Sequence, residues 1–488
     1  MDQATGSLGR EAGSAMRWNT AAAGATLCSQ FLQLVVLARW LSPAEFGLAA
    51  TAISIAGFAQ GLTDFGLTNA LVQRDQIGVK TWASAFWLCV IGGMVLFPAF
   101  YAAAPVCELL MGPKLKGLSP LLGVAALTLL GAGPASMFQA DLQRRLKFSR
   151  LAAAEIIAAA ASLMVALGWA WWRREAMALV AGQVALITIR CASLFLVSSL
   201  RPAPRLRWAD LRPLASFGRY QMGERVLNYA SANFDRLLVA RLLGAASAGY
   251  YTVASQIALR PLALLGPLVF RTLFPLFARL QEEKERLASS LLRSISLLGL
   301  LSAGVYALLF GLADPLSRIV LGAGWGPSVP ALRILAGLGF LWAISNPLAS
   351  LTLALGRAGT GFWINVLALS MNALAVLIGS RYGLKGVAWG MVLSAALMMP
   401  LDFILTRWWI GIAPGRMLSA MGWALPPAIL AALAMQGIGI WVPELARWPE
   451  LGLKGALGCA VFMAAAWFLN RERLRDAVME LSKKLWGA

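Results

Sequence analysis

Long apolar runs follow one another along almost the whole chain, separated by short polar segments rich in arginine and lysine. Most runs reach about 20 residues, the length that a helix needs to cross the hydrocarbon core of a bilayer. Because the runs are continuous rather than alternating in polarity at every second residue, they predict helices and exclude a membrane β-barrel. We expect about fourteen membrane-spanning helices, over residues 18–40, 45–71, 82–108, 118–139, 150–172, 176–200, 214–241, 248–278, 287–312, 328–355, 360–380, 385–407, 416–441 and 450–470.

A pattern of polar positions inside these runs recurs about 202 residues further along the chain. Residues 37–47 align with residues 239–249, sharing Ala, Arg, Leu, Ala and Gly at matching places, and the same offset pairs Gln33 with Asp235. Self-similarity at a fixed offset indicates two copies of one architectural unit. The second copy begins six predicted helices after the first, so both enter the membrane from the same side, and we predict a parallel repeat of two six-helix lobes.

The arginine and lysine content of the loops alternates along the chain and predicts its orientation in the membrane. It is largest around residues 144–150, 201–212 and 279–286 and in the C-terminal tail, so we place these segments and both termini in the cytoplasm. The predicted organisation is a cytoplasmic N-terminal segment (1–17), a first lobe (18–200), a basic cytoplasmic linker (201–213), a second lobe (214–408), two extra helices (409–470) and a cytoplasmic amphipathic tail (471–488).

The composition agrees with a multi-pass membrane protein and narrows its chemistry. Apolar residues make up 59% of the 488 positions and charged residues 13%, and the mean hydropathy is +0.71. The net charge of +20 is explained by the basic loops, so we expect no nucleic acid partner. The chain has no histidine, its five cysteines are scattered, and it has no Walker A sequence, so we expect no metal, no cofactor and no enzymatic site.

The predicted helix over residues 214–241 is the most polar of all. At about 100° per residue, Glu224, Asn228, Ser231 and Asp235 fall along one stripe of this helix. Charges at membrane depth cost roughly 2.5 to 3.5 kcal/mol each on insertion scales, so several on one helix should face a protein interior or a wet cavity. The alternative interpretation is that these residues form internal ion pairs. Both interpretations place the stripe away from lipid.

Further polar positions extend this set of candidates to other helices. Arg260 lies near mid-depth directly before Pro261, where a guanidinium needs an anionic partner. Asp64, Glu155, Asp402 and Arg190 are each suited to a packing-level hydrogen bond, which we favour over ion coupling for the set as a whole. The candidate cavity-lining residues are Gln33, Gln221, Asn228, Ser231, Asn233 and Gln256; the candidate anion-binding residues are Arg260, Arg225, Arg236 and Arg271; and the candidate ion-coupling residues are Asp235, Glu224 and Asp64.

Several segments of the chain resemble a known family. They are LARWLSPAEFGLAATAISIAGFAQGLTDFGLTNALVQR, LQRRLKFSRLAAAEIIA, RYQMGERVLNYASANFDRLLVARLLGAASAGYYTVASQIALRPL and VFRTLFPLFARLQEEKERL, the third including the Asn-x-Asp element at Asn233 and Asp235. They resemble the polysaccharide-transport (Wzx-type) flippases of the multidrug/oligosaccharidyl-lipid/polysaccharide (MOP) exporter superfamily. The resemblance spans most of the chain and is weakest after about residue 410.

The resemblance implies an all-α integral membrane fold of two six-helix lobes around a central cationic cavity, with two extra C-terminal helices. It also implies transfer of undecaprenyl-diphosphate-linked oligosaccharides across the bacterial inner membrane, for exopolysaccharide or lipopolysaccharide synthesis. The lipid-linked glycan and membrane lipids are then the expected partners, together with polysaccharide polymerase or co-polymerase proteins. In this setting the four candidate arginines would bind the lipid diphosphate through charge-assisted hydrogen bonds.

Three other functions remain to be weighed against this one. A drug or metabolite exporter of the same superfamily would share the fold. A membrane-embedded polysaccharide polymerase or glycosyltransferase would need a sizeable outer loop with catalytic groups, whereas the loops near residues 105–117 and 313–327 are short and carry no acidic pair. A purely structural subunit would not need charges inside the membrane. A flippase is therefore the function that the sequence favours.

Overall fold

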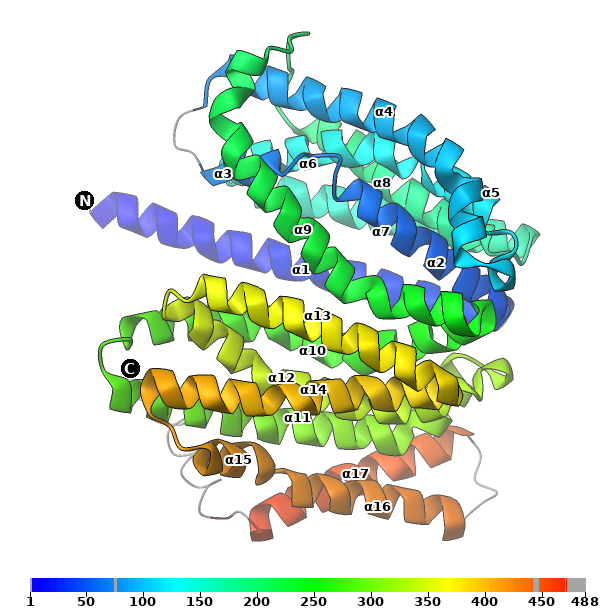
Figure 1. Ribbon diagram of the computed structural model, residues 1–488, viewed down its shortest axis with the longest axis vertical. Coiled ribbons are helices and arrows are strands. Elements are labelled where there is room, and N and C mark those ends of the chain that lie inside the picture. Colours follow the sequence, from blue (N-terminus) through cyan, green and yellow to red (C-terminus); the bar gives the residue numbers. More distant parts are fainter. Residues whose placement is uncertain (1, 74–76, 442–446, 470, 472–488) are drawn as a thin grey trace. The chain divides into compact units, whose positions relative to one another are not determined.

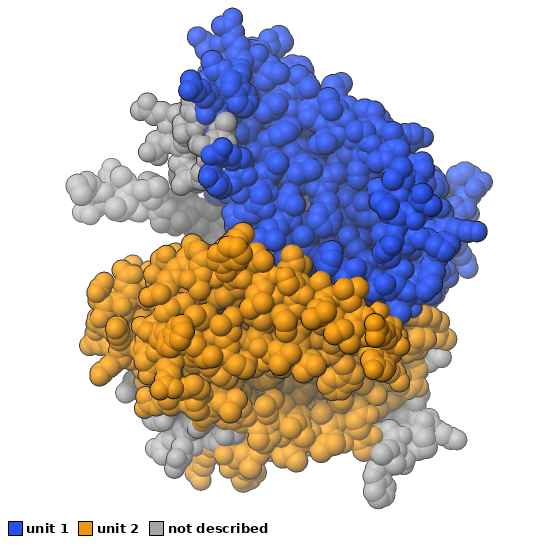
Figure 2. Space-filling model, viewed as in Figure 1, with its two compact units in different colours: residues 1–249 blue, residues 250–488 orange. Residues whose placement is uncertain are grey.

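The computed structural model describes residues 2–73, 77–441, 447–469 and 471, and its elements are helices (Figure 1). The predicted amphipathic tail (471–488) lies outside the described residues, apart from Arg471. The chain divides into two compact units, residues 1–249 and 250–488 (Figure 2).

In the described part of the first unit, eight helices follow the predicted apolar runs, and a ninth is the polar helix. Its elements are α1 (Asp2–Trp40), α2 (Pro43–Gln60), α3 (Leu67–Gln73), α4 (Val79–Met111), the 3-10 turn η1 (Pro113–Leu115), α5 (Leu118–Ala125), α6 (Thr128–Arg144), α7 (Phe148–Trp172), α8 (Met177–Val197) and α9 (Trp208–Leu243). Two predicted helices are each divided in two, residues 45–71 into α2 and α3, and residues 118–139 into α5 and α6.

The second unit begins within α10 and repeats much of this order. Its elements are α10 (Ala245–Arg279), α11 (Lys284–Val320), η2 (Ala323–Trp325), α12 (Ser328–Ala354), α13 (Ala358–Gly379), η3 (Ser380–Tyr382), α14 (Gly383–Ile410), α15 (Pro414–Gly422), α16 (Leu425–Trp441) and α17 (Arg447–Leu469). Within the described residues, 11 helical segments are long and apolar enough to cross a membrane. This confirms an all-helical, multi-pass membrane protein.

The number of fourteen spans stays a prediction. The 11 segments do not include α2 or α9, and one of them joins α13 and α14. The helix α9 is missing from the set because it carries too many charged residues among its apolar ones. It is the same property that singled out this helix in the sequence.

The helix α9 packs against α2, α3 and α4 of the first unit. The sequence grouped it with the second lobe, because its polar pattern matches that of the first predicted helix. Sequence similarity follows the order of a repeat along the chain, whereas packing depends on which surfaces are complementary. The predicted lobe boundaries at residues 200 and 214 therefore stay a prediction about the repeat and do not coincide with the compact units.

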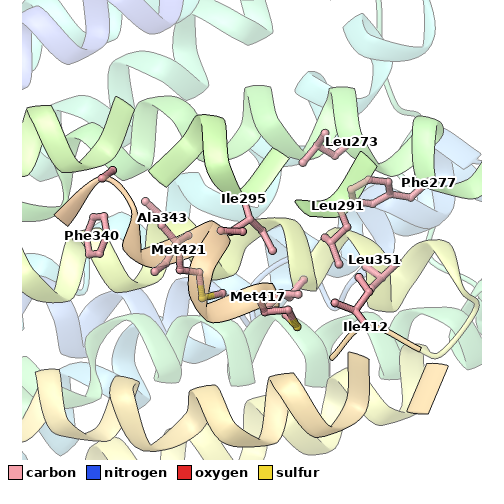
Figure 3. Packing of buried hydrophobic residues seen from close by; sticks show 14 of the residues in the cluster. Leu273, Phe277, Leu291, Ile295, Phe340, Ala343, Leu351, Ile412, Met417 and Met421 are labelled. Atoms are coloured by element: carbon pink, nitrogen blue, oxygen red, sulfur yellow. The ribbon is translucent and has the colours of Figure 1, made fainter. Parts of the chain in front are cut away.

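The second unit has a core to which α15 also contributes (Figure 3). One cluster contains Leu273 and Phe277 of α10, Leu291 and Ile295 of α11, and Phe340, Ala343 and Leu351 of α12. Met417 and Met421 of α15 belong to the same cluster, together with Ile412, which directly precedes α15. The helices α16 and α17 pack against each other and against α11 (Figure 1). The two extra helical segments after residue 408 are thus part of the packing of this unit.

Two turns of the first unit have counterparts in the second unit, as an internal repeat predicts. Gly112 (φ 90°) precedes η1, which buries Leu115 completely. Gly322 (φ 97°) precedes η2, which buries Trp325 almost completely. A positive φ is readily adopted by glycine, so both copies keep glycine where the chain leaves a long helix and turns back.

A second pair of equivalent turns differs in the residue at the left-handed position. In the first unit Leu146 has φ 55°, and the Lys147 amide donates to the Leu142 carbonyl over 2.9 Å. In the second unit Gly356 has φ 70° in the corresponding turn, with the same six-residue hydrogen bond at 3.0 Å. The helices α6 and α12 therefore end in the same left-handed cap, but of the two only α12 has a glycine at the left-handed position.

We expect Leu146→Gly to stabilise the protein by about 0.5 to 1 kcal/mol, because a left-handed conformation costs roughly 1 to 2 kcal/mol for an L-residue and glycine loses part of this gain through its freedom when unfolded. Leu146 is 53% exposed, so little packing is lost. The reverse change, Gly356→Leu, should lower the melting temperature. Thermal unfolding of both variants in detergent tests the pair, and a lower melting temperature for Leu146→Gly would contradict it.

The start of α2 crosses the first turn of α10 at two glycines. Ser42 caps α2, its hydroxyl accepting the Glu45 amide at 3.2 Å, and Pro43 occupies the first helical turn. A Cβ on Gly47 would overlap the carbonyl oxygen of Ala245, and a Cβ on Gly249 would overlap the carbonyl oxygen of Pro43. The two backbones can approach this closely only because both residues are glycine.

Candidate functional site

The polar stripe of α9 lies on one face of this helix. Glu224, Asn228 and Ser231 are exposed, and Asp235 is partly buried. The Gln221 amide donates to the Glu224 carboxylate over 3.1 Å, which holds the two side chains together on this face. The helix presents hydrogen-bonding groups over several turns, as the spacing of the polar residues predicts.

The opposite face of α9 packs against α2, α3 and the break between them. The ring of Tyr229 lies edge-on against Phe58 at 4.9 Å, and its hydroxyl fills the space where Gly57 lacks a side chain. Further along, Gly66 lies directly against the backbone of Gly218. These contacts, which the sequence analysis did not identify, fix the rotation of α9 and so determine which residues of the stripe are exposed.

An ion pair between a buried carboxylate and a partly exposed guanidinium joins this helix to the break between α2 and α3. Asp64 is buried, and its carboxylate accepts the Thr68 hydroxyl at 2.6 Å, the Gly66 amide at 3.2 Å and Nη1 of Arg225 from α9. Phe65 (φ 50°) and Gly66 (φ 68°) are both left-handed at this break. The carboxylate thus holds the strained turn and the guanidinium of α9 at the same time.

The ion pair changes how two candidates are interpreted. The sequence proposed Asp64 for ion coupling and Arg225 for anion binding, and also considered internal ion pairing as the alternative. The contact between them favours that alternative, because Asp64 is surrounded by three donors and Arg225 has its charge compensated. The roles themselves stay predictions.

The remaining candidate residues lie on several helices and differ in their exposure and contacts. Gln33 of α1 lies with its amide nitrogen against Gly182 of α8. The Asn233 amide donates to the Tyr229 carbonyl of its own helix at 3.0 Å. Arg236 is partly buried in the first unit, and in the second unit Gln256 and Arg260 are partly buried and Arg271 is exposed on α10. Among the described residues, no group of three or more His, Cys, Asp and Glu side chains could hold a metal ion.

Three helices of the first unit bring together a polar cluster. Nη2 of Arg190 (α8) donates to Oε1 of Gln139 (α6) at 2.9 Å and to Oε1 of Glu155 (α7) at 3.2 Å. Arg190 and Glu155 thus prove to be hydrogen-bonding partners of each other. Sequence analysis missed Gln139, because a single glutamine near the end of an apolar helix gives no signal of its own.

A second polar pair that the sequence did not reveal lies in α17. Nζ of Lys454 donates to Oε1 of Glu450 at 2.7 Å, and both side chains are buried. The spacing of four residues, with glutamate first, favours such a pair on a helix, so the signal was present in the sequence. Because the charges compensate each other within one helix, the pair lets α17 remain apolar toward its neighbours.

The basic linker folds back onto α4. Nε of Arg205 donates to Oδ2 of Asp210 at 2.9 Å, the Ser84 hydroxyl donates to the same oxygen at 3.1 Å, and the Arg207 amide donates to Ser84 at 3.2 Å. The hydrogen bond from Arg205 is the main reason why the pKa of Asp210 lies below its ordinary value. The carboxylate therefore holds the start of α9 against α4.

We expect this contact to stabilise the protein above the ordinary aspartate pKa of about 3.9 and to be lost as the pH falls through the lowered pKa of Asp210. Asp210→Asn should therefore unfold at a lower temperature than the unmodified protein at pH 7. The difference should shrink at a pH below the lowered pKa of Asp210, where its carboxyl group is protonated and both forms are uncharged at this position. A difference that is constant between these two pH values would contradict the ion-pair explanation.

Comparison with known proteins agrees with this architecture. The polysaccharide biosynthesis protein family matches residues 36–330. The lipopolysaccharide biosynthesis protein WzxC of Escherichia coli (strain K12) is 27% identical over 449 residues, covering 91% of this chain and 87% of that protein. The teichuronic acid biosynthesis protein TuaB of Bacillus subtilis (strain 168) is 28% identical over 439 residues, covering 89% of this chain and 90% of that protein.

Among solved structures, the lipid II flippase MurJ in an inward closed conformation matches with a TM-score of 0.73 over 94% of this chain and 100% of that chain, at 12% identity. This similarity shows a shared fold. The expected resemblance to Wzx-type proteins is thereby confirmed in both sequence and fold. Since the match to the family extends over more than half of the chain, the protein belongs to the polysaccharide biosynthesis protein family.

Proposed function

We propose that the protein is a flippase that moves undecaprenyl-diphosphate-linked oligosaccharide units from the cytoplasmic to the periplasmic leaflet of the bacterial inner membrane. The observation that carries this proposal is the exposed polar stripe of α9, with Glu224, Asn228 and Ser231, in a chain of otherwise apolar helices. Relatives named for lipopolysaccharide and teichuronic acid biosynthesis support a glycan substrate. The fold shared with a lipid II flippase supports a lipid-linked one.

In this mechanism the arginines bind the diphosphate and the polar stripe accommodates the sugars. Arg260, Arg236 and Arg271 each offer a planar fork that can form paired, charge-assisted hydrogen bonds with phosphate oxygens. Arg225 contributes less, because Asp64 already compensates its charge. Gln221, Asn228, Ser231, Asn233 and Gln256 supply neutral donors and acceptors for hydroxyl groups.

Transport would proceed by alternating access, with the cavity open to one side of the membrane at a time. If an ion gradient drives the cycle, Asp235 and Glu224 are the carboxylates of α9 that could load a proton or sodium ion in one state and release it in the other. The cycle makes and breaks no covalent bond, so the protein would not act as an enzyme. Both termini would lie in the cytoplasm, and polymerase proteins would receive the flipped lipid.

Depletion of the protein in its host tests the proposal. The diphosphate-linked glycolipid should accumulate in the cytoplasmic leaflet, and purified protein in liposomes should make the extracted glycolipid accessible to an added glycosidase. Empty liposomes serve as the control. If no diphosphate lipid accumulates and the reconstituted protein instead moves small amphipathic compounds, the protein is an exporter rather than a flippase.

Arg260→Ala should reduce export of the polymer to less than about a tenth while leaving membrane levels of the protein normal, because loss of one charge-assisted contact of about 1.5 to 3 kcal/mol lowers affinity at least tenfold. Arg260→Lys should restore only part of the activity, since lysine lacks the planar fork. Export is measured as polymer released by a complemented deletion strain. Full activity of Arg260→Ala would remove this residue from the site.

A further inference from the structure

The cluster of Gln139, Glu155 and Arg190 has the features of a small binding site. Each side chain comes from a different helix, and the side chains of Arg190 and Glu155 are 30% and 33% exposed. The three positions lie 5 to 7 residues from the helix ends Arg144, Phe148 and Val197, which is roughly 8 to 10 Å into the helices. All three ends belong to the predicted cytoplasmic side, so the cluster lies at one depth, near the side from which substrate would come.

Hydrogen-bonding capacity remains at Gln139 and Glu155. Both hydrogens of Arg190 Nη2 are used, one for Gln139 and one for Glu155. Nε of Arg190 is buried and has no partner among the described residues. The Gln139 amide nitrogen and the second Glu155 oxygen have no protein partner at hydrogen-bonding distance in the described part of the chain. A donor on Gln139 and an acceptor on Glu155 thus lie on either side of Arg190.

The charges in the cluster indicate what kind of ligand it suits. Arg190 is compensated by Glu155, so the cluster is neutral overall and offers an anion little net attraction. A vicinal pair of hydroxyl groups fits better, because one hydroxyl can donate to the carboxylate while its neighbour accepts from the amide or the guanidinium. The three side chains hold one another in place, which lowers the entropy cost of binding.

Polar contacts on α1 continue from the cluster along the same helices. The Ser29 hydroxyl donates to the Ala159 carbonyl of α7 at 3.0 Å, one helical turn beyond Glu155. Gln33 follows one turn later on α1 and lies against Gly182 of α8, two turns from Arg190. A hydroxyl-rich chain could therefore find further partners next to the cluster.

We propose that Gln139, Glu155 and Arg190 form a subsite for the glycan hydroxyl groups of the lipid-linked substrate, separate from the arginines that bind the diphosphate. The proposal rests on the proposed function. It assigns to the first unit a specificity site that distinguishes a glycosylated lipid from the bare diphosphate lipid.

The test measures binding of two probes to the full protein in nanodiscs: the glycolipid extracted from depleted cells, and undecaprenyl diphosphate. The unmodified protein should bind the glycolipid more tightly. Gln139→Leu and Glu155→Gln should each reduce this preference about tenfold, the effect of losing one hydrogen bond to a charged or cooperating group. Affinity for undecaprenyl diphosphate should not change. Gln139→Leu is the sharper variant, because it leaves the ion pair of Glu155 and Arg190 intact.

Glu450→Gln is the matched control, since it removes a carboxylate from a helix-buried pair elsewhere. It should leave the preference for the glycolipid unchanged. An unchanged preference in Gln139→Leu and Glu155→Gln would overturn the subsite, and so would an equal loss of affinity for both probes, which indicates a structural role. If the unmodified protein binds neither probe, the proposed function fails as well. If it binds both equally, only the subsite fails.

Discussion

Replacing Gly47 by alanine is expected to be as damaging as any addition of a single methyl group to this protein. The new Cβ would overlap the carbonyl oxygen of Ala245, and backbone atoms of two crossing helices cannot yield as a flexible side chain can. We expect a loss of at least about 3 kcal/mol of stability, at the upper end of overpacking effects, together with loss of export. The melting temperature in detergent measures the loss of stability, and polymer release by a complemented strain measures the loss of export.

The control for this experiment is Gly24→Ala in α1. A Cβ at Gly24 would meet no atom within 4 Å, and alanine favours a helix over glycine by about 1 kcal/mol, so this variant should be as stable as the unmodified protein or more so. Gly249→Ala should reproduce the defect of Gly47→Ala, since its Cβ would overlap the carbonyl oxygen of Pro43. Normal stability of both Gly47→Ala and Gly249→Ala would show that α2 and the start of α10 lie further apart than in this structure.

Breaking the ion pair of Asp64 and Arg225 should have the second large effect. Removing one partner of a buried pair typically costs about 3 to 5 kcal/mol, because the other charge is left without compensation. Among the described residues, Arg225→Met leaves the Asp64 carboxylate with the Thr68 hydroxyl and the Gly66 amide as donors. We expect this variant to accumulate poorly in the membrane.

The double variant Asp64→Leu, Arg225→Met distinguishes a structural role from a transport role. If the pair is structural, the double variant should recover much of the stability that either single change loses, since no unpaired charge remains. If Asp64 is an ion-coupling group, the recovered protein should fold but fail to export. Recovery of both stability and export would leave neither residue a direct role in transport.

The repeat and the polar stripe could be predicted because both are properties of spacing. The offset of about 202 residues that links Gln33 with Asp235 also links Pro43 with Ala245 and Gly47 with Gly249, and these four residues meet in the structure. The exposed row of Glu224, Asn228 and Ser231 follows from the period of a helix.

The partners of the buried charges could not be predicted in the same way. Arg225 meets Asp64 across a separation of 161 residues, and nothing in the local sequence of either residue indicates the other. The break between α2 and α3 was also missed, because Phe65 adopts a left-handed conformation that a large side chain rarely takes. The strain of this conformation is offset partly by long-range contacts, namely the ion pair of Asp64 with Arg225 and the approach of Gly66 to the backbone of Gly218.

The glycine crossing has a consequence for the origin of the chain. Gly47 lies on Ala245 while Gly249 lies on Pro43, so each copy of the motif gives the other the same contact that it receives. Between separate chains, a reciprocal contact of this kind is that of a two-fold dimer. The contact is thus of the kind that two copies of a half-length chain would form with each other. In a single chain the two copies are free to differ, and glutamine stands at position 33 where aspartate stands at position 235.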